Sequence, residues 1–264
     1  MMKSGRQILA EKMRSMNSTN LLVENTALEF WERVGATPGY PCDIGRWLIR
    51  SQLPIAIKLM PLLDIEKVNA WAYKHDTSYA FREKNRRLRG CILPGKVSTI
   101  FVDASDSLYE QRFTIAHEGG HFLLDYQLPR DKAITTLGEN IIEVFDGKRQ
   151  PTLEERLHGI LADVRVSVTP HLMERPEEGL PMGSILDAED RADRLALELL
   201  APALVLQKEM HSDVAPKKFH ARLAFLGERL YTFYGLPRSI AVFYADMLLH
   251  QWSEPSFHDW LFRL

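Results

Sequence analysis

The sequence contains few cysteines, little net charge and no long apolar run. Two cysteines in 264 residues, Cys42 and Cys91, are too few for a disulfide framework. No stretch approaches the roughly eighteen uncharged apolar residues that a spanning helix needs, so we expect no membrane segment. The 33 Lys and Arg residues nearly balance the 35 Asp and Glu residues. The protein as a whole therefore has no positive electrostatic potential that would attract nucleic acid.

The start of the sequence also lacks an apolar signal core, because charged residues stand there instead, namely Lys3, Arg6, Glu11 and Lys12. Together with the low cysteine content, this favours a cytoplasmic protein. The composition is 45% hydrophobic and 26% charged, which is typical of a globular protein with a sizeable core. We expect residues 1–20 to be a flexible N-terminus ahead of one continuous architecture.

Hydrophobic periodicity predicts mostly helices with a small sheet. Alternating apolar residues predict strands over residues 55–60, 88–93 and 97–103, the last two forming a hairpin, and a possible edge strand at Val164, Val166 and Val168. Helical spacing predicts helices over residues 21–34, 64–71, 109–126, 152–164 and 187–202, and further helices towards the C-terminus. The stretch 173–184 is rich in Pro, Gly and charge and predicts an exposed loop. The fold class is therefore α+β, with the small sheet packed on the helix at 109–126.

That helix carries the strongest motif of the sequence. Ser107 and Glu110 have capping-box spacing, and His117 and His121 follow inside the helix. Because they are four residues apart, the two histidines lie on one face and can offer two imidazole nitrogens to one Zn²⁺. Glu118 lies beside that face, where its carboxylate can act as a general base on water without binding the metal. The alternative is that both histidines are satisfied core or surface residues.

A catalytic zinc needs a third protein ligand, and a downstream acidic helix offers one. Glu189 and Asp193 share one face of this helix. Glu189 can bind the metal, while Asp193 can accept the second N–H of a ligand histidine. The alternative for Glu189 and Asp190 is a solvated helix start that the macrodipole favours. The carboxylates that compete for the third position are Asp125, Asp187, Asp190 and Glu198.

These motifs resemble those of the ImmA/IrrE-like zinc metallopeptidases, which belong with the thermolysin-like gluzincins. Residues 112–124, RFTIAHEGGHFLL, are similar to the family's RFTIAHELGHFLL, and the predicted strand Ile100-Phe-Val-Asp103 precedes them. Residues 189–202, EDRADRLALELLAP, look like the family's ExEANRFAAELLMP. The resemblance places the third ligand on Glu189. It also puts Asp193 where the family usually has Asn, and Gly119 and Ala201 where it has Leu and Met.

The resemblance implies a cytoplasmic zinc endopeptidase that cleaves a helix-turn-helix transcriptional repressor and so switches on stress, mobile-element or phage-defence genes. We expect a metallopeptidase domain with an N-terminal helical extension over residues 21–210, followed by a C-terminal helical region at 211–264, although the clear resemblance covers only residues 86–126 and 187–202. The residues themselves support only metal-assisted hydrolysis. The alternative function is a non-catalytic zinc-containing regulatory module that binds DNA or a partner protein, in which an intact Glu118 would have no use.

Cys91 is a candidate inhibitory ligand, because its strand pairs with the strand that leads into the zinc helix. A thiolate in the fourth position would close the site until it is displaced or oxidised. The alternative is that Cys91 is a small buried hydrophobic residue.

Two further features leave alternatives open. The basic run Arg82–Arg89 could bind a nucleic-acid effector or an acidic segment of the repressor, although a solvated loop is the simpler interpretation. The oxyanion of the reaction also needs a donor. The candidates for it are Tyr109, His158, His171, His211 and Tyr244.

Overall fold

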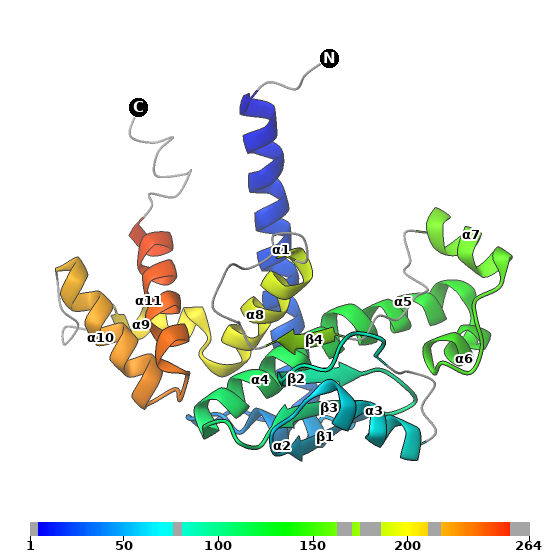
Figure 1. The fold of residues 1–264 in the computed structure, drawn as a ribbon. Helices are drawn as coiled ribbons and strands as arrows, with labels where there is room; N and C mark the ends of the chain where they lie inside the picture. The colour runs from blue at the N-terminus through cyan, green and yellow to red at the C-terminus, as the bar shows by residue number, and fades with distance from the viewer. Residues whose placement is uncertain (1–4, 76–80, 163–170, 175–185, 211–217, 254–264) are drawn as a thin grey trace.

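The computed structural model describes residues 5–75, 81–162, 171–174, 186–210 and 218–253. Within these ranges the protein consists mostly of helices arranged around one small sheet (Figure 1). The predicted α+β class is therefore confirmed. In this part of the chain, no helix combines the length and the apolar character that crossing a membrane requires.

The sheet has four strands in the order β1-β3-β2-β4. These are β1 (Ile55–Met60), β2 (Leu88–Leu93), β3 (Ser98–Asp103) and β4 (His171–Glu174). β1 is parallel to β3, whereas β2 is antiparallel to both β3 and β4. The three strands and the hairpin predicted from alternation are confirmed. The edge strand predicted at residues 164–168 lies outside the described residues, and the start of the predicted loop at 173–184 belongs to β4.

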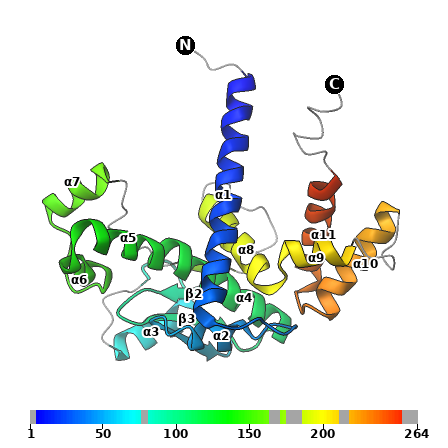
Figure 2. The same ribbon diagram turned by 180° about the vertical axis from the view of Figure 1, so that it is seen from behind.

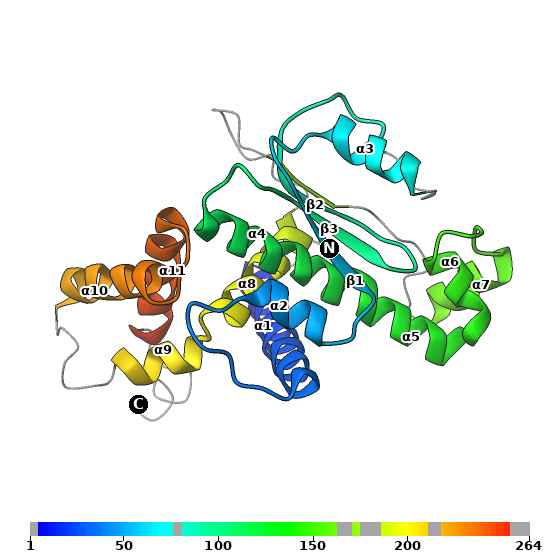
Figure 3. The same ribbon diagram turned by 90° about the horizontal axis from the view of Figure 1, so that it is seen from below.

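The two faces of the sheet bury different side chains because strand residues alternate. Ile92, Ile100 and Val102 belong to the main core, which includes side chains of α4 (Leu108–His121). Phe101 and Leu93 belong to a second, smaller core with α3 (Ile65–Lys74). Figure 3 shows α3 and α4 on opposite sides of the sheet.

The helix that carries the histidines is longer than predicted. α4 continues without a break through a π-helical turn at Phe122–Gln127 into α5 (Leu128–Leu137). The N–H of Leu128 donates to the carbonyl oxygen of Leu123, five residues earlier. This wider turn directly precedes Pro129, which has no N–H to donate to the preceding turn. The helical segment continues to Leu137, so the predicted end of the helix near Tyr126 is wrong. α6 (Ile142–Phe145) and α7 (Leu153–Leu161) follow α5.

α8 (Leu186–Leu200) lies between α4 and α1 (Gly5–Val34). Val23, Ala27 and Phe30 of α1 belong to the main core together with Leu195 and Leu199 of α8. The first half of α1 extends away from the rest of the molecule (Figures 1 and 2). The helix predicted from residue 21 therefore begins earlier, at Gly5, inside the segment expected to be flexible. α2 (Ile44–Arg50) also packs against α4.

Three helices follow α8, namely α9 (Ala203–Met210), α10 (Phe219–Thr232) and α11 (Arg238–Ser253). The turn between α10 and α11 is fixed to the start of α4, where Arg112 Nη1 donates to the carbonyl oxygen of Gly235 at 2.7 Å. Tyr109 also stacks on Tyr231 with ring centroids 5.0 Å apart. The C-terminal helical pair is thus held against the N-terminal end of the histidine helix.

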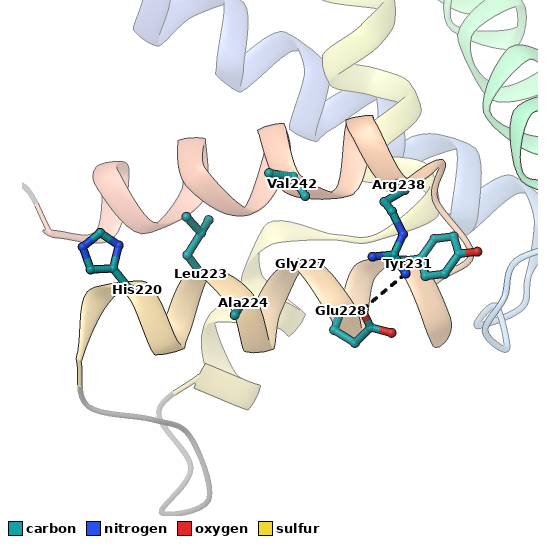
Figure 4. Close-up of a pocket in the computed structure, with 8 residues that line it drawn as sticks. All are labelled: His220, Leu223, Ala224, Gly227, Glu228, Tyr231, Arg238 and Val242. Atoms are coloured by element: carbon teal, nitrogen blue, oxygen red, sulfur yellow. Dashed lines mark ion pairs between the residues drawn. The ribbon is translucent and has the colours of Figure 1, made fainter.

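A groove of about 310 Å³ runs between α10 and α11 (Figure 4). Leu223, Gly227 and Val242 are among its lining residues, and an ion pair of 3.7 Å between Arg238 and Glu228 lies at one end. The groove is lined by residues of α10 and α11 alone and includes no residue of α4 or α8.

Candidate metal centre

The two histidines of α4 lie one above the other and are almost completely buried. His117 is 2% exposed and His121 is 1% exposed, and the ring centroids are 4.8 Å apart. The N-cap Ser107 accepts the backbone N–H of Glu110 at 3.3 Å, which fixes the start of the helix. The local sequence therefore explains both the helix and the shared face.

α8 brings a carboxylate to this face. Glu189 Oε2 lies 3.2 Å from His117 Nε2, and Glu189 Oε1 lies 3.6 Å from His121 Nε2. The three side chains offer ligand atoms that all lie within 4.8 Å of one another, which makes them a group able to hold a metal ion. These are the three residues for which the sequence predicts zinc binding.

The close approach of α8 to α4 depends on Gly120. A Cβ at this position would lie 3.0 Å from the carbonyl oxygen of Ala192 and 3.1 Å from its Cα. Any larger side chain would therefore meet the backbone of α8 directly. Gly120 lets the backbone of the Glu189 helix come close to the histidine helix.

Two further carboxylates contact the Nδ1 atoms of the imidazole rings, on the side away from Glu189. Asp193 Oδ1 lies 2.8 Å from His117 Nδ1, and Asp125 Oδ2 lies 2.8 Å from His121 Nδ1. With Nδ1–H donating to each carboxylate, the Nε2 atom of each ring keeps its lone pair towards Glu189. Carboxylate contacts of this kind orient ligand histidines in metal sites.

The sequence predicts the contact of Asp193 with a ligand histidine, but it offers Asp125 only as a competing third ligand and does not predict its contact with His121. The available signal was the spacing of four residues between His121 and Asp125, the same spacing that singled out Glu189 and Asp193. Among the other competitors, Asp190 pairs with Arg194 at 2.8 Å. Glu198 accepts the N–H of Ala203 at 3.1 Å, and the side chain of Asp187 lies outside the described residues.

The electrostatics of the cluster favour a cation. Burial by itself lowers the pKa of His117, but the carboxylates of Asp193 and Glu189 outweigh it and raise this pKa to about 10. The pKa of His121 is also raised, because the Asp125 and Glu189 carboxylates outweigh burial. Without a metal, the two histidines therefore bind protons more strongly than free imidazoles do.

Glu118 completes the cluster from the same turn of α4. Its side chain is 0% exposed, and both carboxylate oxygens are buried without a hydrogen-bond partner among the described residues. Burial raises its pKa to about 7, although the charges of His117 and His121 oppose this shift. A buried carboxylate without partners is costly unless a ligand, ion or water completes its surroundings.

The donor set fits zinc. Two imidazole nitrogens and one carboxylate oxygen form the three-protein-ligand set typical of catalytic zinc sites. The oxygens of Glu118, which have no hydrogen-bond partner in the described part of the chain, lie beside that set, as expected of a group that acts on water rather than on the metal.

Cys91 does not lie with these residues. It is 0% exposed in the second core, with Phe101 and Leu93, on the side of the sheet covered by α3. Burial raises the pKa of the thiol well above its ordinary value, with a smaller contribution from the charge of Glu118. A protonated thiol is a poor zinc ligand. The geometry thus favours the interpretation of Cys91 as a small buried hydrophobic residue.

The candidates for an oxyanion donor lie elsewhere or outside the described residues. Tyr109 stacks on Tyr231, the hydroxyl of Tyr244 donates to the carbonyl oxygen of Ala201 at 3.1 Å, and His158 is exposed on α7. The side chains of His171 and His211 are not among those described.

The basic run is partly tied into the fold. Arg87 pairs with the buried Asp103 at 2.8 Å, and Arg89 pairs with Glu110 of α4 at 3.1 Å. Arg82 and Lys84 are exposed. Only the first part of the run is therefore a solvated surface, while its end attaches β2 to its neighbours.

Comparison with known proteins identifies the central segment. Residues 72–145 match the family model of the M78 peptidases, described as the IrrE N-terminal-like domain. The match runs from α3 to α6, so it includes His117, Glu118 and His121 and ends before Glu189. No curated protein and no solved structure matches the chain. Residues 72–145 are thus similar to the IrrE N-terminal-like domain of the M78 peptidases, which confirms the resemblance to the ImmA/IrrE-like family.

Proposed function

We propose that this protein is a zinc-dependent endopeptidase. The observation that carries the proposal is Glu118, a fully buried carboxylate with no hydrogen-bond partner among the described residues, next to two histidines and a third carboxylate. His117, His121 and Glu189 would hold the zinc. The chemistry that a bound zinc supplies there is that of a Lewis acid, which polarises a carbonyl and increases the acidity of water.

The chain's own residues would move the proton. Burial raises the pKa of Glu118 to about 7 in the metal-free site, and a carboxylate with a raised pKa is a stronger proton acceptor, as efficient general acid–base catalysis requires. Glu118 would accept the proton of the attacking water and pass it to the amide nitrogen that leaves as the C–N bond breaks. Asp193 and Asp125 would hold the two histidine rings in place during these transfers.

The substrate and setting follow from the family resemblance. A peptidase domain supports a protein substrate, and we propose a helix-turn-helix repressor, cleaved in the cytoplasm to release stress, mobile-element or phage-defence genes. Incubation with casein and with a helix-turn-helix repressor encoded next to this protein's gene tests this proposal. We expect cleavage of the repressor at one or a few sites and little digestion of casein. Efficient casein digestion beside an intact repressor would overturn it.

The metal is tested by measuring zinc content. His117→Ala, His121→Ala and Glu189→Ala should each lose tightly bound zinc, because each removes one of three ligands. Asp190→Asn is the matched control, since this neighbouring carboxylate pairs with Arg194 instead, and it should keep one zinc per chain. Full zinc occupancy in Glu189→Ala would move the third ligand to another residue.

The peptidase is tested by Glu118→Gln. This variant keeps the shape of the side chain but removes the proton acceptor, so it should keep zinc and lose about 10²–10⁴-fold in cleavage rate. Glu110→Gln, on the same helix but paired with Arg89, should cleave like the wild type. Wild-type cleavage by Glu118→Gln, or a wild type that binds zinc and cleaves nothing, would favour the non-catalytic zinc-containing regulatory module.

A further inference from the structure

Three residues of α8, namely Glu189, Arg191 and Asp193, contact the side chains of the candidate metal centre. Glu189 faces the Nε2 atoms of the two histidines, and Asp193 contacts Nδ1 of His117. Between them, Arg191 Nη2 donates to Asp125 Oδ1 at 3.1 Å. The other oxygen of Asp125, Oδ2, contacts Nδ1 of His121 at 2.8 Å.

Asp125 therefore acts as a bridge between Arg191 and His121. Its side chain is only 8% exposed, whereas that of Arg191 is 30% exposed. A carboxylate buried to this extent is costly unless it is paired and hydrogen-bonded. The contact with Arg191 supplies both a positive charge and a donor with a fixed direction.

The charges around the centre show why a positive side chain is needed there. Four carboxylates surround the two imidazoles, namely Glu118, Asp125, Glu189 and Asp193. A divalent cation bound to neutral histidines would offset two of these negative charges. Arg191 adds one more positive charge without occupying a ligand position.

We propose that Arg191 is a positioning residue for His121, acting through Asp125. It holds the Asp125 carboxylate so that Oδ2 accepts from His121 Nδ1, which keeps Nε2 directed at the metal position. The third ligand and the orientation of His121 are then set by the same short stretch of α8. This inference rests on the metal site of the proposed function.

The test compares Arg191→Met with Arg194→Met. The first variant removes the guanidinium and keeps an unbranched side chain. The second removes an arginine three residues later on the same helix, whose partners are Asp190 and Asn20.

Zinc affinity is measured by competition with a chelator, and the Nδ1–H proton of His121 is followed by NMR. Arg191→Met should bind zinc about 10-fold more weakly, as is usual when a contact behind a ligand is lost, and its Nδ1–H should exchange faster with water. Arg194→Met should match the wild type in both measurements.

Two more variants separate positioning from general stability. Arg191→Lys keeps the charge and one donor, so it should recover most of the lost affinity. The double variant Asp125→Asn with Arg191→Met should bind zinc no more weakly than Asp125→Asn alone, because Arg191 acts through Asp125. If Arg191→Met does not fold, Arg191→Ala replaces it, since this variant also removes the donor to Asp125 and should show the same loss of zinc affinity and the same faster Nδ1–H exchange.

The outcomes distinguish this inference from the proposed function. Wild-type zinc affinity and an unchanged His121 Nδ1–H signal in Arg191→Met would overturn the role of Arg191 while leaving the zinc site intact. Additive losses in the double variant would overturn the path through Asp125. A wild type that binds no zinc would overturn the proposed function. In that case, faster exchange of the His121 Nδ1–H in metal-free Arg191→Met would still support the contact of Arg191 with Asp125.

Discussion

The α-carbon of Gly120 faces the backbone of Ala192 so closely that a Cβ would lie 3.0 Å from the Ala192 carbonyl oxygen. This contact sets the distance between the helix of the two histidines and the helix of Glu189. Backbone atoms of a packed helix cannot move aside as a side chain can. The position of the third carboxylate therefore depends on the absence of a side chain at residue 120.

We predict that Gly120→Ala destabilises the protein by about 1–3 kcal/mol through overpacking and weakens zinc binding. Gly119→Ala is the matched control. Its Cβ would meet the side chain of Leu48 at 3.1 Å, which can adjust, and alanine favours the helix by about 1 kcal/mol. Thermal unfolding and chelator competition measure both effects. Equal behaviour of the two variants would contradict the role given to Gly120.

The sequence predicts the local part of the centre well. The cap at Ser107, the helix and the shared face of His117 and His121 depend on neighbours a few residues apart. Periodicity and spacing record such relationships. The same holds for the strands and for the pairing of β2 with β3, where alternation and a Pro-Gly turn are sufficient.

What the sequence does not predict depends on tertiary packing. Alternation places Cys91 on one face of β2, but it does not indicate which face α4 covers. The contact of Arg191 with Asp125 joins residues 66 positions apart, so no local pattern reports it. The extension of the helix beyond Tyr126 depends on a π-helical turn, for which hydrophobic spacing carries no signal.

Cys91→Ser tests the location of this thiol. Because the side chain is packed in the second core, a buried hydroxyl should cost about 1–3 kcal/mol of stability if it finds no partner. Basal cleavage and zinc content of the folded protein should stay at wild-type levels. Denaturant unfolding and zinc analysis provide the measurements. A rise in cleavage would instead restore Cys91 as an inhibitory ligand.

Zinc binding should strengthen as pH rises. In the metal-free protein the pKa of His117 is raised from 6.5 to about 10. Its proton therefore stabilises the fold fully below pH 6.5, and this contribution is lost as pH rises towards 10. Zinc requires the neutral imidazole and must displace this proton. We expect the increase in Tm caused by saturating zinc to be larger at about pH 8 than at about pH 6. A pH-independent zinc effect in the wild type would exclude proton displacement.

Gly90 of β2 lies against the turn of α4 that carries Thr114 and Glu118. A Cβ at Gly90 would collide with Thr114 Cγ2 and lie 3.4 Å from Cγ of Glu118. Gly90→Ala should therefore lower stability by about 1–3 kcal/mol and reduce cleavage by displacing Glu118, while the three zinc ligands stay in place.

Thr114→Ser removes the methyl group with which the new Cβ collides, so the double variant Gly90→Ala with Thr114→Ser should recover part of both losses. The recovery is partial because the Cβ would still lie 3.0 Å from the carbonyl oxygen of Phe101. Gly95→Ala, on the same hairpin, is the control, since its nearest contact would be an ordinary 3.7 Å to Val97. Stability, zinc content and cleavage are measured for the wild type, Gly90→Ala, the double variant and Gly95→Ala. If Thr114→Ser deepens the loss in place of relieving it, the collision is not the cause, and Gly90 does not position Glu118.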